Sequence, residues 1–360
     1  MLQMFWLSPQ NQTYFWPPSL QKTLQPNPKI LKGITGTSIF QTNSIGLRAD
    51  ELPESPSKKI ITIGGSTTEC FYLDQQETWP ALLQHYLNEQ QSDSFWVGNM
   101  GKSGLHSGHH LIQLEHLLQE KVIDSIALII IMVGVNDLNF FLADSSNYLN
   151  QTQEQLTQKV FSITPHNQLP FYKQPAYWQL AKQVKNAMLY GNVAQDDGGT
   201  SYQRWREYRQ QATKQITQAP DLSSALSLYK TNINKLIIKT QKAGIPVLFV
   251  SQPSLWKATM PKAEQELLWM GGVGKYQVQC CSDYYSVTVL AEAMHIFNTQ
   301  LKNACLGQDQ VDFLDLAQRL PKDTTIFLDD CHFNESGATE VANQLANYLI
   351  QDQSVGEYIP

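Results

Sequence analysis

The sequence predicts an α/β fold, a three-layer α/β/α arrangement around a parallel sheet. Five short β-branched or apolar runs alternate with segments whose apolar residues recur at helical spacing. One run, residues 125–134, is apolar without interruption, as is typical of a strand buried on both faces. The alternation pauses over residues 139–222 and then resumes, which indicates a large helical insertion.

The individual elements follow from these patterns in chain order. Strands are predicted at 58–64, 95–101, 125–134, 245–252 and 311–316. Helices are predicted at 78–90, 107–120, 222–243, 284–304 and 335–349. Residues 253–283 are irregular, and the insertion has no clear strand. Strands that alternate with helices in this way favour a flavodoxin-like five-stranded parallel sheet.

Changes in composition mark three regions of the chain. Residues 1–57, rich in Pro, Gln, Asn and Ser, form an extended arm whose later part, 36–48, packs against the core. Residues 58–352 form one domain that carries the insertion 139–222. Residues 353–360 are a C-terminal tail.

Bulk properties exclude several classes of partner. The formal charge is -6 and Lys and Arg are scattered, so nucleic acid is not expected. Five cysteines match no disulfide or zinc pattern and favour a reducing compartment such as the cytoplasm, although the compartment itself stays open. No signal peptide is evident, and the longest apolar run is too short to span a membrane. Oligomeric state is left open.

Polar or glycine residues follow the first three predicted strands directly. Ser66 follows the first strand, Gly104 the second and Asn136 the third. Because the carboxyl ends of parallel strands meet at one edge of a sheet, these residues are expected to converge. Ser66 could instead cap a helix, and Asn136 could be a turn residue.

A histidine and an acid precede the last predicted helix. Serine needs a neighbouring base to act as a nucleophile, and His332 is the candidate. Asp329 lies three residues earlier and can orient the imidazole. Asp330 is the rival acid and is interpreted as a turn or cap residue. The segment could also be a simple loop capped by Asn334.

Three donors are expected to surround a developing negative charge. They are the N–H groups of Ser66 and Gly104 and the side-chain amide of Asn136. Asp137 is interpreted as bracing the loop beside them.

The four segments that begin at Gly64, Asn99, Gly134 and Asp329 resemble, in order, blocks I, II, III and V of the SGNH (GDSL-type) hydrolase superfamily. The resemblance covers about 58–138 and 245–350. It implies Ser66 as nucleophile, His332 and Asp329 as base and acid, and Ser66, Gly104 and Asn136 as the oxyanion hole. Residues 43–48 (NSIGLR) are similar to a preface found in some bacterial members.

The expected activity is therefore serine ester hydrolysis through an acyl-enzyme, without metal or organic cofactor. The resemblance implies a small-molecule or glycan ester that carries a short acyl group. Two alternatives remain: a polysaccharide O-acetyltransferase that uses the same site, and a non-catalytic carbohydrate-binding or scaffold protein.

Two other signals are interpreted as structural. His106 and His110, four residues apart, could suit a metal, but no third ligand lies nearby, so a surface helix is expected. Cys331 beside His332 is expected to be a small buried side chain.

Overall fold

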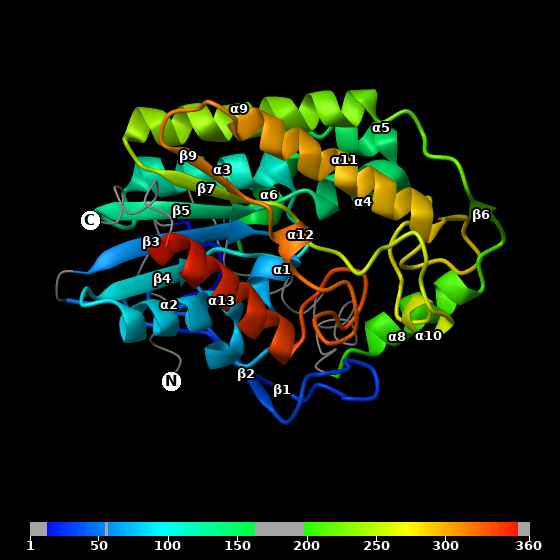
Figure 1. Cartoon of the computed structure of the whole chain (residues 1–360), viewed down its shortest axis with the longest axis horizontal. Helices are drawn as coiled ribbons and strands as arrows, with labels where there is room; N and C mark the ends of the chain where they lie inside the picture. Colours follow the sequence, from blue (N-terminus) through cyan, green and yellow to red (C-terminus); the bar gives the residue numbers. More distant parts are fainter. Residues whose placement is uncertain (1–12, 55–56, 163–197, 352–360) are drawn as a thin grey trace, which may run out of the picture.

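The computed structural model describes residues 13–54, 57–162 and 198–351. Its centre is a five-stranded parallel sheet in the order β4-β3-β5-β7-β9 (Figure 1). The strands are β3 (Lys58–Gly64), β4 (Phe95–Asn99), β5 (Ile126–Met132), β7 (Val247–Val250) and β9 (Val311–Leu314). Counted along the chain, this order is 2-1-3-4-5, the flavodoxin-like order that the sequence predicts.

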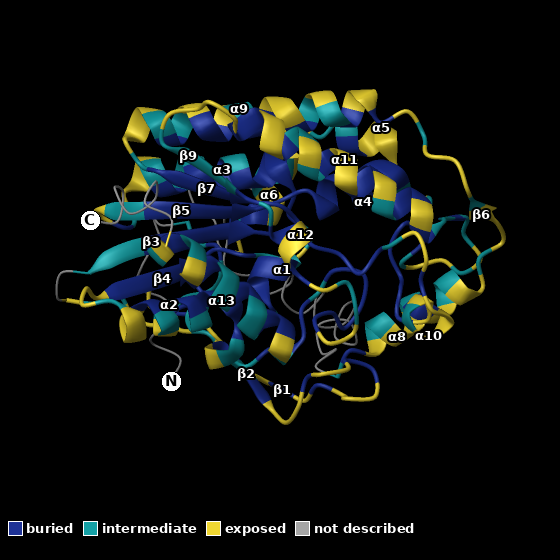
Figure 2. Ribbon diagram, viewed as in Figure 1, coloured by how far each residue is buried: buried dark blue, intermediate teal, exposed yellow. Residues whose placement is uncertain are grey.

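Helices cover both faces of the sheet and complete the three layers (Figure 1). Helices α2 (Trp79–Gln90) and α13 (Glu335–Gln351) pack together on one face. On the other face, α9 (Ser223–Ala243) contacts both α3 (Ser107–Glu120) and α11 (Val287–Cys305). Burial on both sides explains the unbroken apolar run of β5, in which residues 128–132 are at most 1% exposed (Figure 2).

The predicted insertion, 139–222, begins inside the first of several helices that follow β5. These are α4 (Val135–Ala143), α5 (Ser145–Leu149) and α6 (Gln153–Val160), and α8 (Thr200–Gln210) follows later. The expectation that this segment lacks a strand is wrong at one point. Strand β6 (Gln215–Ile216) pairs with β8 (Tyr284–Tyr285). The helix expected to start at 284 therefore starts later, at Val287. Two-residue strands have no periodicity of their own, because a distant partner creates them.

The N-terminal arm packs closely against the domain. Strands β1 (Gln21–Leu24) and β2 (Ser38–Gln41) form an antiparallel pair. Apolar side chains from both the earlier and the later part of the arm join the main core, among them Phe15, Leu31 and Leu47. The tail 353–360 lies outside the described residues.

Short helical turns complete the described chain: α1 (Ser66–Glu69), η1 (Gln75–Glu77), α10 (Lys262–Gln265) and α12 (Leu316–Arg319). Within the described ranges, no helix is both long and apolar enough to cross a membrane.

Candidate active site

Ser66 is the first residue of α1, at the point where β3 ends. Gly65 occupies the N-cap position, so the alternative that Ser66 itself caps the helix is wrong. The glycine is required here, because a Cβ atom at position 65 would lie 2.6 Å from the Asn136 amide nitrogen. At the start of a helix the Ser66 N–H has no intrahelical acceptor and is available to a ligand.

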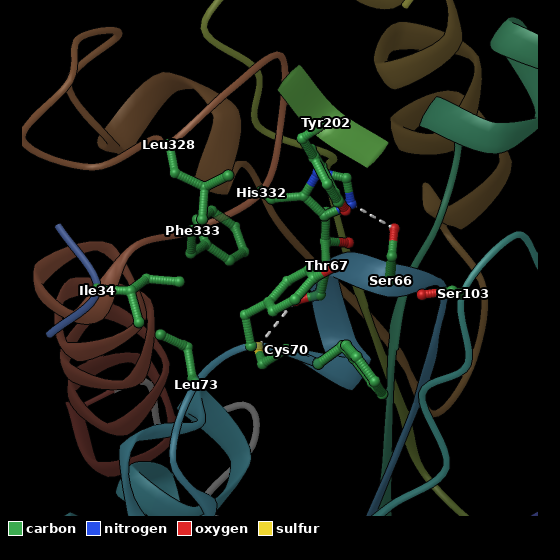
Figure 3. A pocket seen from close by; sticks show the side chains of 12 residues that line it. Ile34, Ser66, Thr67, Cys70, Leu73, Ser103, Tyr202, Leu328, His332 and Phe333 are labelled. Carbon is green, nitrogen blue, oxygen red and sulfur yellow. Dashed lines mark hydrogen bonds between the residues drawn. The ribbon is translucent and has the colours of Figure 1, made fainter. Parts of the chain in front are cut away.

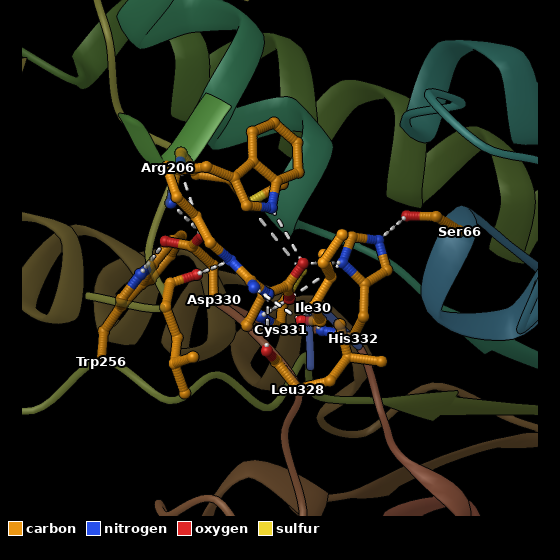
Figure 4. Close-up of polar contacts among 12 residues, drawn as sticks. Ile30, Ser66, Arg206, Trp256, Leu328, Asp330, Cys331 and His332 are labelled. Carbon is orange, nitrogen blue, oxygen red and sulfur yellow. Dashed lines mark hydrogen bonds and ion pairs between the residues drawn. The ribbon is translucent and has the colours of Figure 1, made fainter. Parts of the chain in front are cut away.

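Ser66, His332 and Asp329 form one continuous hydrogen-bonded chain (Figure 4). His332 Nε2 lies 2.7 Å from Ser66 Oγ. His332 Nδ1 lies 2.7 Å from Asp329 Oδ2 and 2.9 Å from Oδ1. These contacts leave Nε2 as the nitrogen that can accept the serine proton, while Nδ1 keeps its hydrogen on the carboxylate.

Asp329 is fully buried and is held by several donors in addition to the histidine ring. Trp269 Nε1 donates to Oδ2 at 2.8 Å, and the backbone N–H groups of Cys331 and His332 donate to Oδ1 at 3.0 and 2.9 Å. Burial opposes ionisation, but His332 and these hydrogen bonds outweigh it and lower the pKa of Asp329. The carboxylate in turn raises the pKa of His332 above its ordinary value, against the effect of burial.

Asp330 points away from His332, in agreement with its interpretation as a structural residue. Its Oδ1 accepts a hydrogen bond from Trp256 Nε1 at 2.8 Å. Its Oδ2 accepts from the backbone N–H groups of Trp269 and Met270 at 2.7 and 3.2 Å. Asp330 therefore holds the backbone at Trp269 and Met270, and in this position the Trp269 ring can donate its hydrogen bond to Asp329.

Gly104 and Asn136 line the same cavity as Ser66 and His332, a space of about 420 Å³. Asn136 lies in the first turn of α4, so its alternative role as a turn residue is wrong. Its amide nitrogen donates one hydrogen to the Leu105 carbonyl at 2.7 Å, which leaves the second hydrogen for a ligand.

Asp137 is buried and braces this region. It accepts hydrogen bonds from the Ser107 N–H at 3.1 Å and the Tyr148 hydroxyl at 2.8 Å. These bonds attach the start of α4 to α3 and α5. They therefore hold in place the helical turn that carries Asn136.

A second, much smaller cavity of about 20 Å³ lies beside Ser66 and His332 (Figure 3). Its walls are mainly apolar and come from several segments, including Ile34 of the arm and Phe333 after the histidine. The larger cavity is lined by six aromatic residues, of which Phe71, Tyr72 and Tyr202 also line the small cavity. The six are Phe71, Tyr72, Phe140, Tyr202, Trp205 and Trp269.

Three supporting residues could not be found from the sequence alone. Trp269 lies in a segment predicted only as irregular. Arg206, from α8, donates to the carbonyls of Leu267, Ile30 and Leu328 at 3.0, 2.6 and 2.9 Å (Figure 4). Glu69 is 1% exposed, one helical turn after Ser66. No sequence pattern indicates that Arg206 and Glu69 are buried, because arginine and glutamate are usually exposed.

The expectation that His106 and His110 lie on a helix surface is wrong. They are 3% and 1% exposed, because α9 and α6 pack over α3. Each is already engaged: His106 Nε2 lies 2.7 Å from Gln151 Oε1, and His110 Nδ1 lies 2.9 Å from Gln113 Oε1.

Among the described residues, one group of metal-ligating atoms is compact: Asp329, Cys331 and His332. Its acid and histidine are bound to each other, and burial raises the pKa of the Cys331 thiol. These residues fit a proton relay better than a metal centre.

A hydrogen-bonded Ser–His–Asp chain at the carboxyl edge of a parallel sheet is the arrangement used by serine hydrolases of α/β architecture. Residues 61–339 match the model of the GDSL-like Lipase/Acylhydrolase family, and the chain belongs to that family. It is a hydrolase of ester bonds.

Three solved structures with some likeness to the chain have 12–13% identity to it. Axe2, an acetylxylan esterase from Geobacillus stearothermophilus, has 13% identity and a TM-score of 0.40, over 82% of this chain and 94% of that one. TesA has 13% identity and a TM-score of 0.42, over 81% and 98%. The psychrotrophic esterase EstA from Pseudoalteromonas sp. has 12% identity and a TM-score of 0.43, over 83% and 100%. No curated protein matched the sequence. The family assignment therefore rests on the family model.

Proposed function

We propose that this protein is a serine esterase that removes short acyl groups through an acyl-enzyme. The observation that carries the proposal is the Ser66–His332–Asp329 chain, with both His332 nitrogens engaged at 2.7 Å. Ser66 is the nucleophile, His332 the general base and acid, and Asp329 the group that orients the imidazole.

The reaction follows from this geometry in two halves. Ser66 Oγ attacks the ester carbonyl carbon while His332 Nε2 takes the hydroxyl proton. The resulting oxyanion accepts hydrogen bonds from the N–H groups of Ser66 and Gly104 and from the Asn136 amide. The intermediate collapses, His332 returns the proton to the leaving alcohol, and the acyl group stays on Ser66. Water, activated by His332, then attacks the acyl-enzyme and releases the acid.

The two cavities support a short acyl group on a larger alcohol. A volume of about 20 Å³ is enough for roughly one water-sized group, which matches the methyl of an acetyl ester. The cavity of about 420 Å³ offers aromatic faces on which a sugar ring can stack. We assign the acyl group to the first cavity and a carbohydrate alcohol to the second.

The decisive experiment replaces the nucleophile. Ser66→Ala should abolish hydrolysis of p-nitrophenyl acetate and labelling by a fluorophosphonate probe, whereas Ser146→Ala, at an exposed serine of α5, should leave both unchanged. Labelling that persists in Ser66→Ala would contradict the proposal. Adding xylo-oligosaccharide to the assay distinguishes hydrolysis from acyl transfer, because transfer would move the acetyl group to the sugar.

A further inference from the structure

Two of the proposed oxyanion donors lie on different segments, and a bond between two side chains links these segments. The Ser66 N–H belongs to α1, after β3, and the Gly104 N–H belongs to the loop after β4. Ser103 directly precedes Gly104, so the position of Ser103 fixes the peptide plane that presents the Gly104 donor. The Ser103 hydroxyl donates a hydrogen bond to Glu69 Oε2, across to α1.

Glu69 is itself held rigidly by its backbone. Its N–H donates to the Gly65 carbonyl at 3.0 Å, and its carbonyl accepts from the Arg48 guanidinium of the arm. The loop after β4 approaches closely, since a Cβ atom at Gly101 would lie 2.3 Å from the Glu69 nitrogen. Asn99 Nδ2 adds a bond to the Thr68 carbonyl at 2.9 Å. These contacts fix the backbone from which the Glu69 carboxylate reaches Ser103.

Burial of a carboxylate costs free energy unless hydrogen bonds or opposite charges compensate for the lost hydration. Burial raises the pKa of Glu69, and the Ser103 hydrogen bond and the Arg48 charge act in the opposite direction. A negative charge here also helps to raise the pKa of His332. The ionisable groups that influence Glu69 or are influenced by it come from five segments: Arg48, Cys70, Lys102, Tyr202 and His332.

We propose that Glu69 is a positioning residue that acts through Ser103 to hold the Gly104 N–H in register with the Ser66 N–H. The role rests on the proposed esterase function, because it aligns donors for that oxyanion. In this role Glu69 makes no contact with substrate, so its function differs from that of each triad residue.

The test combines single and double variants with p-nitrophenyl acetate as substrate. Ser103→Ala and Glu69→Ala should each lower kcat about tenfold or more, with KM changed less than threefold, because the donors act on the transition state. The double variant Glu69→Ala/Ser103→Ala should be no slower than Glu69→Ala, because both changes break the same link. Glu89→Gln, at an exposed acid of α2, is the matched control and should retain wild-type kcat.

Glu69→Gln separates positioning from simple structural support. Its amide oxygen can still accept the Ser103 hydroxyl, so kcat at high pH should stay within threefold of wild type. Thermal unfolding of every variant checks folding.

Three results would overturn the role: an unchanged kcat in Ser103→Ala, losses that multiply in the double variant, or a kcat of Glu69→Gln as low as that of Glu69→Ala. In each case an active wild type and an inactive Ser66→Ala would leave the esterase function intact. A folded wild type without esterase activity would overturn the esterase function and this role together.

Discussion

In the proposed reaction, the charge state of His332 decides whether Ser66 can be activated. As a base His332 must be neutral, and Asp329 favours its protonated form. The same carboxylate that orients the ring therefore also makes it a stronger base. The stacked Trp269 ring, with its centroid 6.3 Å from that of His332, shields this pair from solvent on one side.

The pH dependence of activity follows from this pairing. Below the pKa of His332 the imidazole is protonated and cannot accept the Ser66 proton, so kcat/KM should rise with pH. Because the pKa of His332 is raised, the midpoint should lie above the ordinary histidine value of about 6.5. A kcat/KM profile between pH 5 and 9 measures it. A rate that is flat across this range would contradict a histidine base.

If the small cavity holds the acyl group as proposed, the arm and the loops that enclose it select the acyl-chain length. Ile34 comes from the arm and closes one wall beside Ser66. Ile34→Ala should admit longer chains and raise the butyrate-to-acetate ratio of kcat/KM about tenfold, since each methylene in a fitted apolar pocket counts for about 1–3 kcal/mol. Ile238→Ala, at an exposed position of α9, is the control. A ratio that does not change would place the acyl group elsewhere.

Helix α8 joins three parts of the chain through one side chain. The Arg206 guanidinium binds carbonyls of the arm, of the segment before Trp269 and of the loop before Asp329. Arg206→Met would leave these carbonyls unpaired, and each unsatisfied buried group costs about 1–3 kcal/mol. Urea unfolding should show a loss of at least about 3 kcal/mol, the sum of three such groups at the low end. Arg204→Met, exposed on the same helix, should show little change.

The buried histidines of α3 make the stability of the whole molecule sensitive to acid. Burial lowers the pKa of both His106 and His110 to about 4. Between about pH 6.5 and 4 the unfolded chain binds protons that the folded chain rejects, so stability falls as pH falls. The buried acids Glu69 and Asp137, whose pKa values are raised, act in the opposite direction.

A variant isolates the histidine contribution. His110→Gln removes one such group, and the drop in Tm between pH 7 and pH 5 should be smaller in the variant than in the wild type. Differential scanning calorimetry at the two pH values measures the difference. An equal drop in both proteins would mean that His110 is not part of the acid response.

The sheet and the residues at its edge were predictable because local patterns specify them. An apolar run such as β5 is visible in any sequence window, and a parallel sheet places Ser66, Gly104 and Asn136 along one edge. Burial of His106 and His110 was not predictable, because it depends on α9, more than a hundred residues later. The same holds for Arg206, whose three acceptors lie far from it in sequence.

The distance along the chain between Ser66 and His332, 266 residues, has a consequence for biosynthesis. A ribosome exposes the N-terminal part first, so the serine is present long before the histidine has been translated. A nascent chain that carries all of β3 and α1 therefore has no means of activating its serine. In the proposed mechanism, the ability to cleave an ester arises only after residues 329–332 have been translated and have folded against Ser66.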